Sequence, residues 1–208
     1  KEIFRGESFI NYFATKHFTT MLDIGGGDGL ASSNLITQYN KKVDLIELEN
    51  SYYLKKNKNK HLFNKIIKGD FLKHNLKKYD AVLCSHVLEH QENIKLFLDK
   101  IDSVLKKNGY LCLIVPPRKP FIISGHINLF NAGLLLYRLI LSGFDCKKAQ
   151  VVQYDYNICI LLKKTKIKLP KLRGDIGDLD KLKKFFPFKI TEGFNGDIMN
   201  INFNNNII

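Results

Sequence analysis

Short apolar runs alternate with amphipathic segments over most of this chain of 208 residues. Almost every position within a run is apolar, which is typical of strands that are buried on both faces of a parallel sheet. The alternation of strands and helices predicts an α/β fold with right-handed crossovers. We expect strands at 19–25, 41–49, 65–70, 79–86 and 110–117.

Helical spacing of apolar residues marks the segments between these runs. Ser51 is a candidate N-cap for the helix at 51–60, and the Asn-Gly pair at 108–109 is a stop signal for the helix at 92–107. The first residues mix aromatic and polar side chains at near-helical spacing, so we expect one or two helices that cover the site entrance. The predicted helices lie at 1–18, 30–39, 51–60, 92–107 and 131–144.

The organisation of the chain changes near residue 164. Residues 147–164 read as two strands with a tight connection, and this hairpin is expected to close one edge of the sheet. Beyond it the pattern weakens, with one helical piece at 179–186. We therefore predict a main domain over 1–164 and a C-terminal appendage over 165–208.

The composition indicates a soluble chain with a substantial core. Hydrophobic residues make up 45%, and no run is long enough to span a membrane. The four cysteines are dispersed without a C-x-x-C pair, so they are expected to be buried free thiols rather than disulfides or zinc ligands. A cytoplasmic location follows as an expectation. These cysteines are Cys84, Cys112, Cys146 and Cys159.

The net charge of +13 comes mostly from lysine, since 29 of the 33 basic residues are Lys. Recognition of bases and phosphates relies more on arginine, whose planar group makes paired hydrogen bonds. We therefore interpret the charge as a solvated surface and do not expect a nucleic-acid partner. A small anionic substrate stays compatible with it.

A glycine-rich turn, LDIGGGDG (22–29), follows the first predicted strand and precedes a helix. The simplest interpretation is a tight strand-to-helix turn, but strand, glycine turn and helix together also form nucleotide sites. The spacing Asp23-x-Gly25-x-Gly27-x-Gly29 differs from the dinucleotide fingerprint G-x-G-x-x-G. Asp23 would repel a pyrophosphate, whereas it suits an ammonium group. S-adenosylmethionine carries such a group and no phosphate.

Acidic residues after the next two strands fit the same ligand. Glu47 is expected to bind the ribose hydroxyls, with Glu49 as the alternative, and a surface carboxylate is the simpler interpretation of either. Asp70 is expected to meet the adenine amino group, with Phe71 against the ring.

These motifs, taken in order, resemble the class I S-adenosylmethionine-dependent methyltransferases. The resemblance implies a Rossmann-like, mostly parallel sheet of seven strands with an antiparallel last strand and helices on both faces. It also implies that the cofactor binds at the carboxyl ends of the strands, where Leu48, Ser85 and His86 join the contacts named above. The motifs that carry it are LDIGGGDG (22–29), IELE (46–49), GDF (69–71), YDAVLCSHVLEH (79–90), LKKNGYLCLIVPP (105–117) and SGF (142–144).

Three histidines are candidates for a base that takes a proton from the methyl acceptor. His86 ends the fourth predicted strand, His90 follows four residues later, and His126 lies in the long connection after the fifth. Arg118 and His126 are candidate contacts to the acceptor. The positive charge of Arg118 would favour an anionic acceptor. The sequence shows no zinc-ligand spacing or run of three carboxylates, so no metal is predicted.

The resemblance favours an oxygen of a sugar or activated sugar as the acceptor, in the biosynthesis of surface polysaccharides. Two alternatives remain open at this point: an enzyme that methylates RNA or another small molecule, and a module that binds the cofactor without turnover. The sequence does not predict an oligomeric state.

Overall fold

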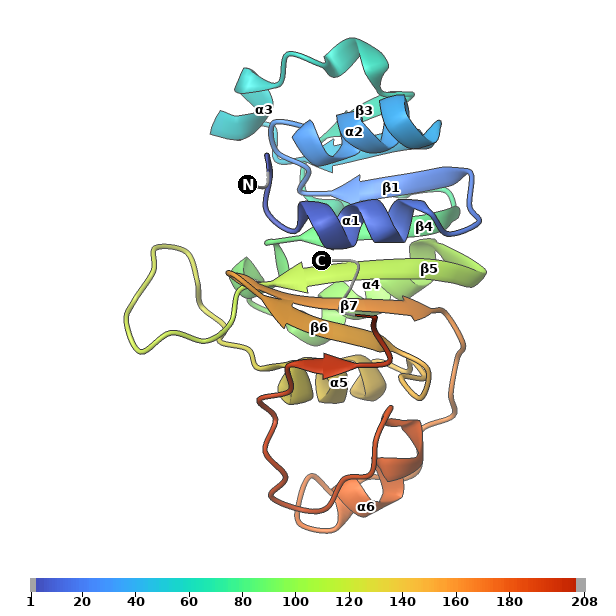
Figure 1. Ribbon diagram of the computed structural model, residues 1–208, viewed down its shortest axis with the longest axis vertical. Coiled ribbons are helices and arrows are strands. Elements are labelled where there is room, and N and C mark those ends of the chain that lie inside the picture. Colours follow the sequence, from blue (N-terminus) through green and yellow to red (C-terminus); the bar gives the residue numbers. More distant parts are fainter. Residues whose placement is uncertain (1–2, 205–208) are drawn as a thin grey trace.

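A mixed sheet forms the centre of the molecule (Figure 1). In the computed structural model, which describes residues 3–204, its eight strands occur in the order β3-β2-β1-β4-β5-β7-β6-β8. The strands are β1 Thr20–Ile24, β2 Lys42–Glu47, β3 Lys65–Lys68, β4 Tyr79–Ser85, β5 Leu105–Val115, β6 Gln150–Tyr154, β7 Asn157–Lys163 and β8 Asn200–Ile201.

The first five strands are parallel to one another, and β7 runs antiparallel to both β5 and β6. The α/β fold with a mostly parallel sheet is therefore confirmed, and so is the hairpin of β6 and β7. The expected number of seven strands and the hairpin edge are wrong, because Ile201 and Asn200 pair with Val151 and Val152 of β6. The edge strand on this side is therefore β8.

Helices cover both faces of the sheet, with α1 and α2 in front of it and α4 and α5 behind it in the view of Figure 1. Ser51 caps α3 as expected, since its hydroxyl accepts a hydrogen bond from the Leu54 N–H. The helices are α1 Glu7–Ala14, α2 Leu30–Tyr39, α3 Tyr52–Lys56, α4 Ile94–Val104, α5 Ala132–Leu141 and α6 Asp178–Leu182, with 3-10 turns at Lys60–Leu62, Phe71–Lys73, Leu88–His90 and Lys183–Phe185.

Two hydrophobic clusters, one on each face, bury the strands on both sides. Within β1, Leu22 and Ile24 face the cluster that includes α4 and α5, while Met21 faces the one that includes α1 and α2. This two-sided burial explains why the strand sequences are apolar without alternation. The four cysteines are buried thiols that form no disulfide, as expected.

The boundary between α4 and β5 differs from the prediction. The helix ends at Val104 and not at residue 107, and β5 begins at Leu105 and not at Tyr110. Leu105 is buried and pairs with Tyr79 of β4, with a register shift before the next pair. Sheet pairing and burial thus outweigh the Asn-Gly stop signal, and Asn108 takes a left-handed conformation within the strand.

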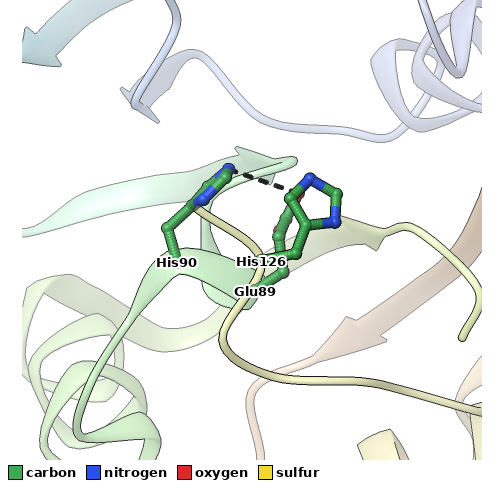
Figure 2. A group of neighbouring side chains, drawn as sticks. All are labelled: Glu89, His90 and His126. Carbon is green, nitrogen blue, oxygen red and sulfur yellow. Dashed lines mark ion pairs between the residues drawn. The ribbon is translucent and has the colours of Figure 1, made fainter. Parts of the chain in front are cut away.

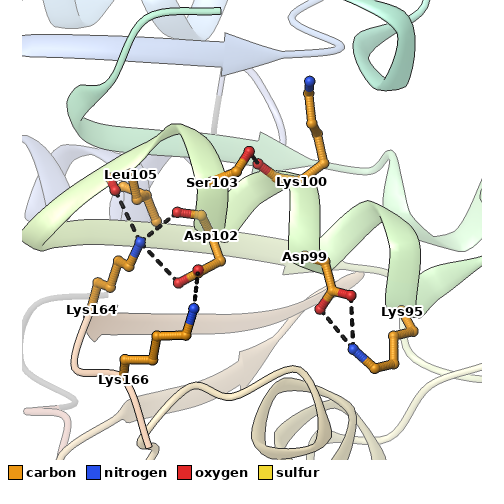
Figure 3. A network of polar contacts seen from close by, with 8 residues as sticks. All are labelled: Lys95, Asp99, Lys100, Asp102, Ser103, Leu105, Lys164 and Lys166. Carbon is orange, nitrogen blue, oxygen red and sulfur yellow. Dashed lines mark hydrogen bonds and ion pairs between the residues drawn. The ribbon is translucent and has the colours of Figure 1, made fainter. Parts of the chain in front are cut away.

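Ion pairs and a hydrogen bond join the end of α4 and the start of β5 to the residues that follow β7, at the edge opposite the glycine-rich turn (Figure 3). The Lys164 ammonium lies 2.9 Å from an Asp102 carboxylate oxygen and donates to the Leu105 carbonyl at 3.0 Å. Lys166 adds a second contact to Asp102 at 3.4 Å. This network holds α4 against the sheet at a distance from the candidate site.

The segment after β7 packs against the sheet and helices. Leu182, Phe186 and Ile190 are buried in the same cluster as α4 and α5, and the expected helical piece at 179–186 is present as α6 and the following 3-10 turn. Within residues 3–204, no helix has the length and apolar character required to cross a membrane.

Candidate functional site

The parallel register brings the carboxyl ends of three central strands to one edge. Ile24 at the end of β1 pairs with Ile46 of β2 and Cys84 of β4. The strand order changes direction between β1 and β4, which is where open α/β sheets bind their ligands. The glycine-rich turn after β1 lies at this point.

The turn and the end of β2 are joined by hydrogen bonds. Gly27 donates its N–H to one carboxylate oxygen of Glu47 at 2.9 Å, and Leu48 donates to the other at 2.8 Å. Gly27 has φ of 54°, a left-handed conformation that favours glycine. The structure therefore brings together Gly27, Glu47 and Leu48.

Asp23 lies beneath the turn and is 2% exposed. It accepts a hydrogen bond of 2.5 Å from the Ser32 hydroxyl. Burial raises the pKa of Asp23 to about 7, with a smaller contribution from the charges of Glu47 and Asp28 and against the effect of the Ser32 hydrogen bond. A cationic group placed next to this carboxylate would stabilise its ionised form.

Gly26 is a residue that the motif spacing did not single out. A Cβ atom at this position would collide with the Asp23 carboxylate, so only glycine leaves the carboxylate its place beneath the turn. The signal was present in the sequence as the middle glycine of three in a row, Gly25 to Gly27.

Two neighbouring cavities lie over this edge and share Gly25, Gly27, Tyr53, His86 and His90 in their walls. One has a volume of about 700 Å³ and contains Asp23 and Ser85. The other has a volume of about 470 Å³ and contains Glu47, Leu48, Asp70 and Phe71.

One predicted cofactor residue lies outside these walls. Gly29 is the residue before α2, and a Cβ atom there would collide with the Asn57 amide and the Phe63 ring, so packing alone already requires glycine at this position. Glu49 is also absent from both walls, which favours Glu47 over it as the ribose contact.

A buried carboxylate joins the candidate histidines at the end of β4. Glu89 has an exposed fraction of 0%. One of its oxygens lies 3.5 Å from His86 Nδ1 and 3.7 Å from His90 Nε2. Figure 2 shows that His126, which comes from the connection between β5 and α5, reaches the same place. Its ring centre is 5.0 Å from that of His90.

Comparison with known proteins shows which proteins this chain is similar to. Residues 22–113 match the family model described as "Methyltransferase domain". The chain contains a methyltransferase domain. Such a domain implies S-adenosylmethionine as the cofactor, and the buried Asp23 carboxylate and the glycine turn fit the ammonium and the close approach of that ligand. No curated protein sequence matches the chain significantly.

Solved structures agree on the fold. A human N-acetylserotonin methyltransferase in complex with SAM is 17% identical, with a TM-score of 0.61 over 78% of this chain and 52% of that one. The 1,6-didemethyltoxoflavin-N1-methyltransferase of Burkholderia thailandensis, with bound S-adenosylhomocysteine, is 16% identical, with a TM-score of 0.63 over 78% of each chain. A mitomycin 7-O-methyltransferase is 16% identical, with a TM-score of 0.58 over 76% of this chain and 54% of that one. The chain thus spans about half the length of several structures that it matches.

A third cavity lies next to the cofactor edge of the methyltransferase domain. It has a volume of about 370 Å³ and is formed by the connection between β5 and α5 together with Tyr156. His126 lies in its wall and also in the wall of the cavity of about 700 Å³. This side chain is therefore placed between a cofactor space and a separate space of a size suited to a small molecule.

Of the two predicted acceptor contacts, His126 lines this cavity and Arg118 does not. Lys119 lines it, whereas Arg118 does not and instead pairs with Asp197 at 2.6 Å, with 61% of its side chain exposed. Burial lowers the pKa of His126, together with the nearby charges of His90, His86 and Arg5 and against that of Glu89. A neutral ring at this position is able to accept a proton.

Glu89 is the residue of this cluster that the sequence interpretation missed. In the segment YDAVLCSHVLEH the predicted roles fall on Ser85, His86 and His90. The signal that identifies it is three-dimensional, because only the fold shows that a fully buried carboxylate lies among three histidines.

Proposed function

We propose that this chain transfers the methyl group of S-adenosylmethionine to an oxygen of a small polar acceptor, with a sugar or an activated sugar as the favoured class. The observation that carries the proposal is the position of His126 in the walls of both the cofactor cavity and the neighbouring cavity. Buried thiols that form no disulfide fit a reducing compartment, so a cytoplasmic location is part of the proposal.

The chemistry requires alignment and removal of a proton. When bound, S-adenosylmethionine supplies a methyl group that is already activated by its positively charged sulfur. The chain contributes positioning and a sheltered cavity, and the cluster around Glu89 provides the groups that take up the hydroxyl proton. The Nδ1 atom of His90 lies 2.6 Å from the Gly125 carbonyl oxygen, so Nδ1 donates and Nε2 is left to accept.

The cavity of about 370 Å³ that contains Tyr156 is the proposed acceptor cavity. Two cations beside it support an anionic acceptor. The Arg5 guanidinium lies 5.2 Å from the centre of the Tyr156 ring, and the Lys119 ammonium lies 5.4 Å from it. An acceptor whose ring rests on Tyr156 would therefore meet positive charge with a phosphate or carboxylate. A sugar phosphate or a nucleotide-linked sugar has this chemistry.

We expect Lys119→Ala to raise the KM for an anionic acceptor by about tenfold, because it removes one charge-assisted contact. The KM for a neutral acceptor should be unchanged. Arg118→Ala is the matched control, since Arg118 is the adjacent cation and pairs with Asp197 outside the cavity. Steady-state kinetics with a charged and an uncharged acceptor decide this, and an equal effect of both variants would contradict it.

Hydroxylated aromatic compounds are a second candidate acceptor class. Most residues around the cavity are apolar, including Phe121, Ile122 and Ile127. Such walls favour a flat apolar ring with one reactive hydroxyl.

The proposal is tested by incubating the protein with S-adenosylmethionine and panels of nucleotide-sugars, phosphorylated sugars and hydroxylated aromatics. Mass spectrometry should detect a product heavier by one CH₂ group. We expect His126→Ala or His90→Ala to lower the rate at saturating cofactor by about 10²–10⁴-fold, while cofactor affinity is kept. His61→Ala, which changes an exposed histidine outside the cluster, is the control.

Two results would contradict the proposal. Cofactor binding without transfer to any acceptor in the panels would favour the non-catalytic module. Rates near wild type in both histidine variants would show that the cluster does not activate the acceptor oxygen.

A further inference from the structure

The Glu89 carboxylate is buried without the partners that such a group requires. Among residues 3–204, no group donates a hydrogen bond to either of its side-chain oxygens, and His86 Nδ1 is unsatisfied as well. A buried charge without compensation costs several kcal/mol, so proteins pair it or place it on a metal ion. A cation bound next to the Glu89 carboxylate would supply the missing compensation.

The hydrogen bonds of two histidines leave lone pairs that face this carboxylate. His90 donates from Nδ1 to the Gly125 carbonyl, so its Nε2 lone pair lies toward Glu89 at 3.7 Å. His86 Nε2 lies 2.9 Å from the Asn157 amide oxygen and donates to it, so its Nδ1 lone pair lies toward Glu89 at 3.5 Å. Metal-binding histidines typically show this arrangement, in which the second ring nitrogen donates to a carbonyl oxygen.

His126 completes a set of three ligands. One ligand atom each from Glu89, His90 and His126 lies within 4.8 Å of the other two, and Figure 2 shows the three side chains converging. Tetrahedral zinc, with bonds of about 2.1 Å, holds its ligand atoms about 3.4 Å apart. The Glu89–His90 separation is already close to this value, and His126 lies outside regular helix or strand, in the connection between β5 and α5.

We propose that Glu89, His90 and His126 bind a divalent transition metal ion of the zinc type. Two imidazoles and one carboxylate suit zinc and its neighbours, whereas magnesium prefers oxygen ligands. Three protein ligands leave a fourth position open, as in catalytic zinc sites.

The position of this ion suggests a role in the proposed methyl transfer, and that role rests on the proposed function. His126 lies between the cofactor cavity and the acceptor cavity, so the open position faces the space where the acceptor hydroxyl would lie. A bound metal lowers the pKa of a coordinated hydroxyl, and the released proton passes to solvent. His90 and His126 would then hold the ion rather than act as bases.

The test uses the whole chain and metal alone. Protein freed of metal by a chelator is titrated with Zn²⁺ in competition with a chromophoric chelator, and Co²⁺ is added in a parallel titration followed by visible absorption. We expect one Zn²⁺ per chain, an intense Co²⁺ spectrum typical of four ligands, and no competition by Mg²⁺. Zn²⁺ should also raise the unfolding temperature in the absence of cofactor.

Matched variants locate the ion. Glu89→Gln, His90→Ala and His126→Ala should each weaken Zn²⁺ binding by at least about 100-fold, whereas His61→Ala should leave it unchanged. Circular dichroism verifies folding, and Glu89→Gln keeps the size of the buried side chain. Absent binding, or binding that survives all three substitutions, overturns the site.

The two proposals fail separately. Zn²⁺ binding is measured without cofactor or acceptor, so a lack of methyl transfer leaves this result intact. Conversely, methyl transfer by protein that does not bind Zn²⁺ would reject the metal site and keep the histidine base.

Discussion

Gly27→Val is expected to abolish cofactor binding. Gly27 lines both cavities over the cofactor edge, so a valine side chain would occupy the space of the ligand. Its Cβ would lie 3.3 Å from the Tyr53 Cβ, and the φ of 54° is unfavourable for a β-branched residue. Isothermal titration with S-adenosylmethionine should show a loss of at least about 100-fold, or roughly 2.7 kcal/mol.

The control for this variant is Gly177→Val, at the start of α6. Gly177 also has a positive φ, of 90°, but nothing lies within 4 Å of the added Cβ. It therefore introduces the same type of backbone strain far from the cavities. If both variants lose the cofactor equally, or if Gly27→Val binds it like the wild type, the glycine turn is not the cofactor site.

Much of the fold could be predicted because local signals agree with burial. Residues 30–39 form α2 with the predicted limits, and the apolar runs became strands because both faces of the sheet are covered. The errors occur where long-range pairing decides. Leu105 departs from the helical pattern because it pairs with Tyr79. Asn200 and Ile201 add an edge strand, and a strand of two residues is too short to show a recognisable pattern in the sequence.

The cofactor edge was easier to predict than the acceptor side for the same reason. Asp23 and Glu47 lie at the carboxyl ends of β1 and β2, and Gly27 follows β1. These ends must meet in a parallel sheet, so spacing along the chain places the three residues together. Arg118 lies in a connection without regular structure, where no periodicity shows that its side chain turns to Asp197. Glu89 could not be identified because its significance rests on contacts with histidines from separate segments.

Asp23 makes the free protein less stable as the pH rises. Its pKa is about 7 in the folded chain, above the value of 3.8 that an unperturbed Asp shows. The unfolded chain therefore releases this proton first, and the folded state loses stability between these two pH values and levels off above them. The expected loss between pH 4 and pH 8 is about 4 kcal/mol from this group.

Cofactor binding should show the opposite trend. An ammonium beside Asp23 requires the ionised carboxylate, so affinity should rise with pH through about 7 and binding at pH 6 should release a proton. Titration calorimetry in buffers of different ionisation enthalpy measures that proton directly. A pH-independent affinity without proton release would show that Asp23 does not face the cationic group.

Asp23→Asn separates the two effects. The amide oxygen can still accept the Ser32 hydrogen bond, so the fold should be kept, and denaturation at pH 5 and pH 8 should show a smaller fall in unfolding free energy than in the wild type. At pH 8 the same variant should bind the cofactor about 2–5 kcal/mol more weakly, because a buried charge pair has lost one partner. A variant that is more stable at pH 8 but binds more weakly is the expected result, since the ionised carboxylate destabilises the fold without the cofactor and is needed only to bind it.

Asp28→Asn is the control, because it changes another carboxylate in the wall of the same cavity. It should have a smaller effect on both the unfolding free energy and the cofactor affinity, because Asp28 is less buried than Asp23.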